Sequence, residues 1–190
     1  MGDGKEVAIE NVAIGDMIRT FDEPTGKFTA SPVTKTFHHG VSEDTIVEMA
    51  LSNGRRLIPN ARHLIYANGS YQSAGDIALA FLAGQPVIFA GADTDSLSPT
   101  SVFLEFVTIR KSTESFYNLH VRSPHDQPFA ESDIGHNYVA EGIVVHNLKV
   151  LENALAERQA YDEACWAQGG ESFGSNGSAQ SNYYATCRKL

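Results

Sequence analysis

Two Asn-Gly dipeptides, each placed between segments of strand-like sequence, constrain the fold of this chain more than any other feature. Asn53-Gly54 lies between IVEMALS and RRLI, and Asn68-Gly69 lies between HLIYA and SYQSA. Asn and Gly accept the positive φ angles of tight hairpin turns, so each dipeptide predicts a two-residue β-hairpin. Pro24-Thr25-Gly26-Lys27 is a further turn signal. Short alternating segments joined by turns at this spacing predict an all-β fold up to Asn147.

Three other stretches refine this expectation. Ala74 to Phe81 has the composition of one or two helical turns. Tyr138 to Val145 predicts a last strand pair that turns near Glu141-Gly142. Val102 to Ile109 alternates, which predicts a strand with its odd-numbered residues on one face.

The sequence changes character after Asn147. Apolar residues follow at helical spacing, and residues 169–186 are rich in Gly, Ser and Asn. This pattern predicts two parts, a β-domain over residues 1–149 and a helix with a flexible tail over 150–190. Both cysteines, Cys165 and Cys187, fall in the second part; a disulfide across the tail is one interpretation, and free thiols are the one we favour.

The charge of the chain restricts its partners. Asp and Glu total 23 against 14 Lys and Arg, a net charge of −9, which argues against nucleic acid or an anionic membrane as partner. The most apolar window, 79–92, is shorter than the roughly 20 residues of a membrane-spanning helix. His38-His39, His120 and His125 match no zinc spacing and are interpreted as surface histidines. We therefore expect a monomer without metal or cofactor.

The junction His146-Asn147-Leu148 carries the chemistry that stands out. An Asn carboxamide can attack its own backbone carbonyl, which cuts the following peptide bond and leaves a succinimide. The reaction needs a donor to the carbonyl, an acid for the leaving nitrogen and a rigid backbone. A histidine with a pKa near neutrality can supply the first two. A hairpin turning near Glu141-Gly142 would bring His136 close to His146, so two imidazoles could converge on Asn147.

A simpler interpretation of Asn147 exists beside this one. The dipeptide His-Asn occurs twice, at 136–137 and at 146–147, so it carries little information by itself. An Asn that precedes a helix is also a preferred N-cap, and HNLKVLENAL would suit that role.

Four stretches in order carry a resemblance to a known superfamily. YNLHV (117–121) and HNYVAEGIVVHN (136–147) closely resemble the C-terminal splicing motifs of inteins and bacterial intein-like domains, members of the Hint (hedgehog/intein) superfamily. The N-terminal stretch that contains IGD resembles the first Hint hairpins, and NGRRLIPNARHLIYANGSYQSAGDI resembles the second Hint block. The resemblance implies a horseshoe of short antiparallel strands with two pseudo-symmetric halves, ending near Lys149.

The resemblance also implies roles for five residues. His63 matches the histidine that helps activate the N-terminal scissile bond, and Asn60 stands where the family usually has Thr. Asn can still donate and accept hydrogen bonds, so part of that support for His63 is expected to remain. His136 and His146 match the histidines that assist Asn cyclisation, and Asn147 matches the cyclising Asn.

Two departures from the family pattern decide which activity to expect. Family members begin with a Cys or Ser nucleophile, but no Cys or Ser precedes Ser31, so the N-terminal acyl shift is not expected in this sequence. Ligation needs Cys, Ser or Thr after the Asn, and Leu148 offers no nucleophile. The expected function is single-turnover self-cleavage at Asn147–Leu148 without ligation, with the flanking polypeptide as substrate. The alternative is a degenerate Hint remnant that serves as a structural or protein-interaction module.

Overall fold

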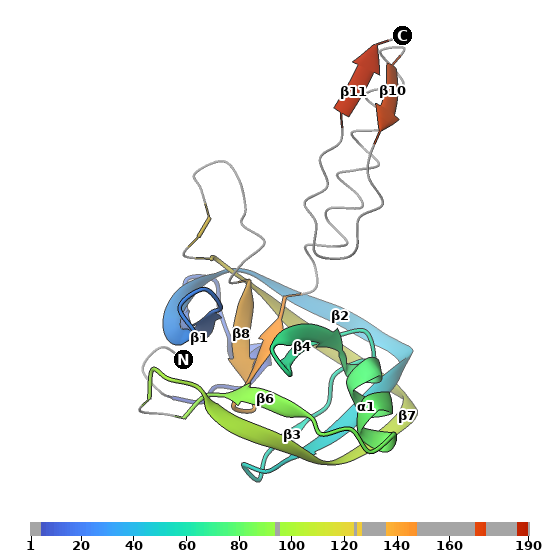
Figure 1. The fold of residues 1–190 in the computed structure, drawn as a ribbon. Helices are drawn as coiled ribbons and strands as arrows, with labels where there is room; N and C mark the ends of the chain where they lie inside the picture. Colours follow the sequence, from blue (N-terminus) through green and yellow to red (C-terminus); the bar gives the residue numbers. More distant parts are fainter. Residues whose placement is uncertain are drawn as a thin grey trace. The chain divides into compact units, whose positions relative to one another are not determined.

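The computed structural model describes residues 5–93, 96–123, 125–126 and 136–147, and the backbone of 170–173 and 186–189. The chain divides into two compact units, Met1–Asn147 and Leu148–Leu190. Antiparallel strands make up most of the first unit, the body (Figure 1). The described elements of the body are η1 (Ile9–Asn11), β1 (Met17–Asp22), β2 (Lys27–Leu51), β3 (Arg56–Leu57), β4 (Leu64–Ala67), β5 (Ser70–Ser73), α1 (Ala74–Leu82), β6 (Ile88–Gly91), β7 (Thr100–Val121), β8 (Asn137–Ala140) and β9 (Ile143–His146).

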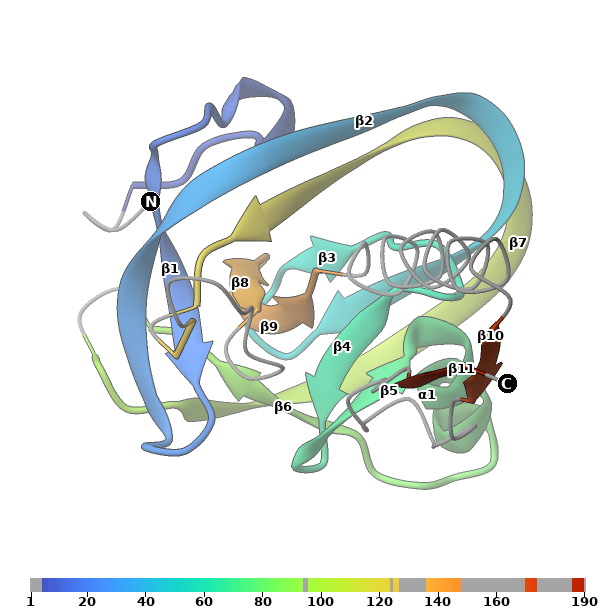
Figure 2. The same ribbon diagram turned by 90° about the horizontal axis from the view of Figure 1, so that it is seen from above.

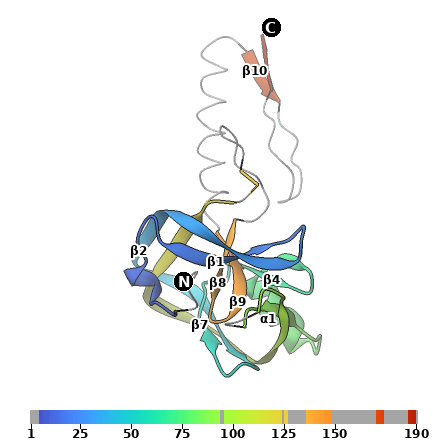
Figure 3. The same ribbon diagram turned by 90° about the vertical axis from the view of Figure 1, so that its left-hand side faces the viewer.

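One sheet connects the strands that the structure describes in the body. Its order is β1-β2-β7-β6-β4-β9-β8, with β3 paired to β2, β5 paired to β4, and a further pairing between β6 and β9. β2 and β7 run antiparallel as a long curved ribbon, and the β8–β9 hairpin lies inside the curve (Figure 2). Seen from the side, β1 lies next to β8 (Figure 3). This arrangement places the C-terminal hairpin of the body against β1, β4 and β6 and inside the curve of the β2–β7 ribbon.

The prediction of short strands is wrong for β2 and β7, which have 25 and 22 residues. The pairing between them shifts register between Val33 and Lys35, between His39 and Ser42, and between Ala50 and Leu51. Each irregularity bends the ribbon and interrupts the alternation of buried and exposed residues. One continuous strand therefore has the sequence pattern of several short ones.

Both hairpins predicted from the Asn-Gly dipeptides are present. Asn68 and Gly69 have φ angles of 51° and 83° and form a two-residue turn between β4 and β5, as predicted. At Asn53-Gly54 only Gly54 has a positive φ, and the Leu51 N–H donates to Arg55 O at 3.0 Å. The hairpin between β2 and β3 is therefore present, but its loop has three residues rather than two.

The predicted short helix is present as α1. The Ser73 hydroxyl caps it by accepting a hydrogen bond from the Asp76 N–H at 3.0 Å. Ala74, Ile77 and Ala78 are buried on one side of the helix, where they join the main core of the body. That core also contains fully buried side chains of the sheet: Val47, Met49, Ile65, Phe89 and Ile143. None of the helices in the described residues has the length and hydropathy needed to cross a membrane.

The second unit is described only in part. The backbones of β10 (Gly170–Phe173) and β11 (Thr186–Lys189) pair antiparallel, with Gly170 opposite Lys189. The rest of the predicted flexible tail lies outside the described residues, so that part of the expectation stays a prediction. The helix predicted after Asn147 and the thiol of Cys165 lie outside the described residues, as does the side chain of Cys187.

Candidate functional site

A tight turn fixes the register of the hairpin that carries the predicted site. Glu141 and Gly142 have φ angles of 50° and 78°, as a two-residue turn with both central residues in the left-handed region requires. The turn pairs Ala140 with Ile143 and Asn137 with His146. A side chain at Gly142 would meet Asn53 Nδ2, since a Cβ there would lie 2.8 Å from it. The predicted hairpin is thus confirmed, and it places the two His-Asn dipeptides opposite each other.

The hairpin delivers Asn147 to a buried position. Asn147 follows the last residue of β9 and has 0% of its surface exposed. Its N–H donates to the carbonyl oxygen of His136 at 3.1 Å, which continues the ladder one step past the strand pair. His136 therefore contacts Asn147 through its backbone.

His146 lies in a confined environment. Its ring packs against that of Tyr71 in a T-shaped arrangement, with ring centroids 4.7 Å apart and an interplanar angle of 76°. Burial, with a smaller contribution from the charge of His136, lowers the pKa of His146 to about 4. The sequence-based expectation of a pKa near neutrality is therefore wrong for His146, because β9 carries it into the protein interior.

One contact of His146 opposes this shift. A hydrogen bond to the backbone of Asn147 raises the pKa of His146. A hydrogen bond that raises the pKa of an imidazole stabilises its protonated form, so its backbone partner is an acceptor. The backbone acceptor of a residue is its carbonyl oxygen. This sign is the one that donation from the His146 ring to the Asn147 carbonyl would produce, and that carbonyl is the group that cyclisation of Asn147 would attack.

His136 is held on both sides of its ring. The side chain is 2% exposed, its Nδ1 donates to Val121 O at 3.0 Å, and its Nε2 lies 3.1 Å from Asp126 Oδ1. The ring centroid of His120 is 5.3 Å away. His120 is 6% exposed, with its Nδ1 2.6 Å from the Thr34 hydroxyl. The interpretation of His120 as a surface histidine is therefore wrong, because Thr34 of β2 and the ring of His136 pack against it.

His63 lies near His146, and its backbone is bonded to that of Asn60. The His63 N–H donates to Asn60 O at 3.1 Å, and His63 O accepts from the Ala74 N–H at 2.8 Å. Burial lowers the pKa of His63 to about 4, and the charge of His63 in turn lowers the pKa of His146. Asn60 Oδ1 is buried and has no hydrogen-bond partner among the described residues. The side-chain support expected from Asn60 is therefore not made by this atom.

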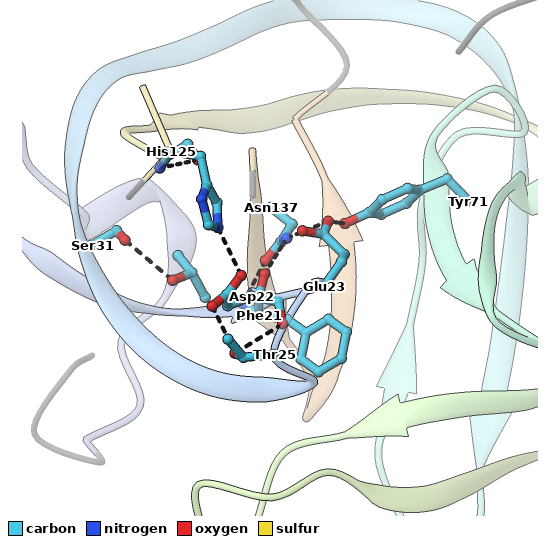
Figure 4. Close-up of polar contacts among 10 residues, drawn as sticks. Phe21, Asp22, Glu23, Thr25, Ser31, Tyr71, His125 and Asn137 are labelled. Carbon is cyan, nitrogen blue, oxygen red and sulfur yellow. Dashed lines mark hydrogen bonds and ion pairs between the residues drawn. The ribbon is translucent and has the colours of Figure 1, made fainter. Parts of the chain in front are cut away.

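Sequence reasoning missed a buried polar network beside the site (Figure 4). The Asn137 carboxamide accepts from the Phe21 N–H at 2.7 Å and donates to Phe21 O at 2.8 Å and to Glu23 Oε1 at 3.1 Å. The Tyr71 hydroxyl donates to the same Glu23 oxygen at 2.7 Å. Burial and the charge of Glu23 raise the pKa of Tyr71. The repetition of His-Asn was the available signal for Asn137; nothing local pointed to Tyr71.

A second histidine–carboxylate pair stands next to this network. His125 Nε2 lies 2.8 Å from Asp22 Oδ1, and the Thr25 hydroxyl donates to Asp22 Oδ2 at 2.6 Å (Figure 4). The bonds from Thr25 and His125 lower the pKa of the Asp22 carboxyl. His125 was interpreted as a surface histidine and is 36% exposed at its side chain. Among the described residues, no group of three or more His, Cys, Asp or Glu side chains is arranged to hold a metal ion.

Comparison with solved structures identifies the fold. No protein-family model matches the sequence, and no curated protein does. The Ssp DnaB mini-intein variant M86 superposes with a TM-score of 0.56 at 19% identity, over 77% of this chain and 91% of its own. A DnaB intein from Synechocystis sp. PCC 6803 gives 0.55 at 19% identity, over 77% and 95% of the two chains. This chain has the Hint fold. A bacterial intein-like domain from Clostridium thermocellum has the same Hint fold, with a TM-score of 0.53 at 18% identity over 74% and 88% of the chains.

Proposed function

We propose that this Hint domain cuts its own chain at the Asn147–Leu148 bond by cyclisation of Asn147, without joining the flanking segments. In this reaction Asn147 Nδ2 bonds to its own carbonyl carbon, and the bond from that carbon to the Leu148 nitrogen breaks. Nδ2 loses a proton and the Leu148 nitrogen gains one, so a succinimide and a free amine form without water. Each molecule reacts once, on its own polypeptide, and no cofactor takes part.

The buried position of Asn147 at the end of β9, directly after His146 and bonded through its N–H to the His136 carbonyl, carries this proposal; the effect of the Asn147 backbone on the pKa of His146 supports it. A donor on the Asn147 carbonyl polarises the carbon under attack and stabilises the oxyanion that develops there. With a pKa of about 4, His146 is neutral at pH 7 and serves there as a donor. Its protonated fraction grows as the pH falls, and with it the capacity to protonate the leaving nitrogen of Leu148.

His136 has a positioning role in this proposal. Its carbonyl accepts the Asn147 N–H at 3.1 Å, and its ring is held by Val121 O and Asp126. The scissile carbonyl is thus attached to a rigid strand end, which favours an in-line approach of the carboxamide. His63 and Asn60 do not contact the Asn147 carbonyl in this scheme; a neutral His63 avoids a second positive charge near His146.

Two further observations agree with cleavage without ligation. The boundary between the two compact units falls at Asn147–Leu148, so the cut would separate them without breaking either one. Leu148 carries no nucleophilic atom to receive an acyl group.

A degenerate Hint remnant that serves as a structural or interaction module is the second candidate. The buried Asn60 Oδ1 without a partner among the described residues favours it, because a working site is expected to satisfy its polar atoms.

Intact mass measured during incubation at pH 5 to 8 separates the two candidates. Cleavage yields a fragment that ends at Asn147, as succinimide or after its hydrolysis, and a peptide that begins with Leu148. We expect Asn147→Ala to abolish both products. An unchanged mass after prolonged incubation at every pH would favour the remnant.

A further inference from the structure

A continuous line of aromatic rings leads from the first hairpin of the body to His146. Phe28 and Phe21 have centroids 5.3 Å apart, Phe21 and Tyr66 5.4 Å, and Tyr66 and Tyr71 5.2 Å. The step from Tyr71 to His146 is the shortest, 4.7 Å. The interplanar angles lie between 52° and 76°, the tilted and edge-on geometries that aromatic rings prefer. These five rings form an aromatic column that ends at His146, and they come from strands near both ends of the body.

Tyr71 is the member of this column whose position is fixed at both ends. Its ring is wedged between Tyr66 and His146, and its hydroxyl donates to Glu23 Oε1. Asn137 Nδ2 donates to the same oxygen, and Asn137 is itself bonded to the backbone of Phe21 (Figure 4). A ring held in this way has little freedom to rotate, so it restricts the imidazole packed against it.

Strand β8, which pairs with the strand of His146, is also bonded to Glu23. Asn137 is the register partner of His146 in the β8–β9 pair. The network therefore connects the residue opposite His146 to the ring that contacts His146. The backbone and side chain of His146 are both held relative to the same carboxylate, Glu23.

We infer that Tyr71 is a positioning residue for the cleavage proposed above: its ring orients the His146 imidazole toward the Asn147 carbonyl and keeps water from it. This inference rests on the proposed function for its catalytic consequence, but the orientation of His146 can be measured without cleavage. Burial as the main cause of the lowered His146 pKa agrees with it.

The test compares variants that separate the ring of Tyr71 from its hydroxyl. Tyr71→Phe keeps the ring, and we expect cleavage to slow by no more than about threefold, with His146 titrating as in the parent chain. Tyr71→Leu removes the ring. We then expect the pKa of His146 to move toward its ordinary value, and the rise in cleavage rate between pH 7 and pH 5 to become much smaller than in the parent chain. Tyr71→Met is the second ring-less variant, for use if the Leu variant does not fold.

Imidazole spectra of ¹⁵N-histidine-labelled protein provide the second readout. They are recorded on full-length chains that carry Asn147→Ala, which keeps every chain intact during titration. The matched control is Phe106→Leu. Phe106 is 60% exposed on β7, opposite Ala50 of β2, and belongs neither to the aromatic column nor to the Glu23 network, so its loss is expected to change neither cleavage nor the His146 resonances.

The two readouts distinguish failure of this inference from failure of the proposed function. If the His146 titration is the same in the ring-less variants as in the parent, Tyr71 does not position His146, whatever happens to the rate. If the parent chain never cleaves, the proposed self-cleavage is wrong, and the spectra still decide the role of Tyr71. A shifted titration with Leu or Met, restored by Phe, supports the inference.

Discussion

The dipeptide His-Asn occurs at both ends of the β8–β9 hairpin, and the asparagines of its two copies differ in their hydrogen-bond partners. Asn137 and Asn147 are both fully buried. In the first copy, both N–H bonds of the carboxamide are donated, to Phe21 O and to Glu23 Oε1, and its oxygen accepts the Phe21 N–H. A carboxamide held in this way joins β8 to β1 and has no freedom to attack its own carbonyl.

The second copy stands where the strand pair ends. The Asn147 N–H donates to the His136 carbonyl, and in the proposed function the Asn147 carbonyl accepts from His146. The comparison teaches that the dipeptide itself has no defined role. A buried Asn serves as a structural clamp when its side chain replaces a strand partner, and it is a candidate for cyclisation when a donor faces its carbonyl. When the protein is incubated without protease, we therefore expect no fragment that ends at Asn137. Asn137 is thus an internal control for cleavage at a buried Asn that follows a His.

The largest effect in this comparison, after Asn147 itself, is expected from His146→Ala. Removing the donor on the Asn147 carbonyl should slow cleavage by about 100- to 1,000-fold at pH 6, the usual cost of losing an oxyanion donor. His146→Gln retains an N–H donor without an acid and should recover part of the loss. Rates of fragment formation by mass spectrometry measure both. Equal rates in the parent and His146→Ala would remove His146 from the mechanism.

The pH dependence of the cleavage rate tests whether His146 also acts as an acid. With a His146 pKa of about 4, the protonated fraction rises about tenfold for each unit that the pH falls between 7 and 5. If protonation of the leaving nitrogen limits the rate, cleavage should accelerate up to about 100-fold over that range. His146→Gln should lose this slope. A rate that is flat from pH 5 to 8 would show that His146 acts only as a neutral donor.

Acid also lowers the stability of the body. His63 and His146 have pKa values of about 4 when folded and an ordinary value of 6.5, so the unfolded chain binds more protons between these limits. Stability is complete above pH 6.5, falls as the pH drops, and by pH 4 has lost about 3 kcal/mol for each histidine. Urea titrations at pH 7 and pH 5 measure this loss and define the lower limit for the rate measurements.

The sequence predicts the parts of this site that depend on local backbone preferences. The turns at Asn68-Gly69 and Glu141-Gly142 follow from residues that tolerate or require positive φ, and the second turn is enough to place His136 against Asn147. Four motifs in order also predicted the Hint fold, which the structural comparisons confirm.

Features that depend on distant pairing could not be predicted in this way. Val102 to Ile109 alternates in sequence, yet Val102 and Leu104 are buried while Phe103 is 48% exposed, and Val107 is again buried. The register shift opposite Ala50 and Leu51 exchanges the two faces within the strand. The low pKa of His146 has the same kind of origin, because Tyr71 reaches it from another hairpin.

Asn137→Ala tests the clamp directly. The change removes three hydrogen bonds and leaves the Phe21 N–H and carbonyl without their side-chain partner, so we expect a loss of about 3 kcal/mol in the free energy of unfolding. Cleavage should slow by about tenfold, because the strand opposite His146 is less well held. Urea denaturation and timed mass spectra measure the two effects.

Asn53→Ala is the matched control for the clamp. Its Nδ2 donates to Glu141 O at 3.2 Å at the exposed turn of the same hairpin, so its loss should cost less than about 1 kcal/mol. A loss for Asn137→Ala no larger than this would mean that Asn137 is not a clamp.

The smallest effect is expected from Asp126→Asn. The carboxylate lies 3.1 Å from His136 Nε2, but His136 contacts Asn147 through its backbone carbonyl, so weakening the ring contact should cost about 1 kcal/mol and slow cleavage by about fivefold. Asp22→Asn is the matched control, since it weakens the neighbouring carboxylate–imidazole pair with His125. A loss of more than about 100-fold for Asp126→Asn alone would show that the His136 ring takes part in proton transfer, because general acid–base catalysis contributes on that scale. His136 would then belong with His146 in the chemistry, and the contrast between the two dipeptides would rest on their asparagines alone.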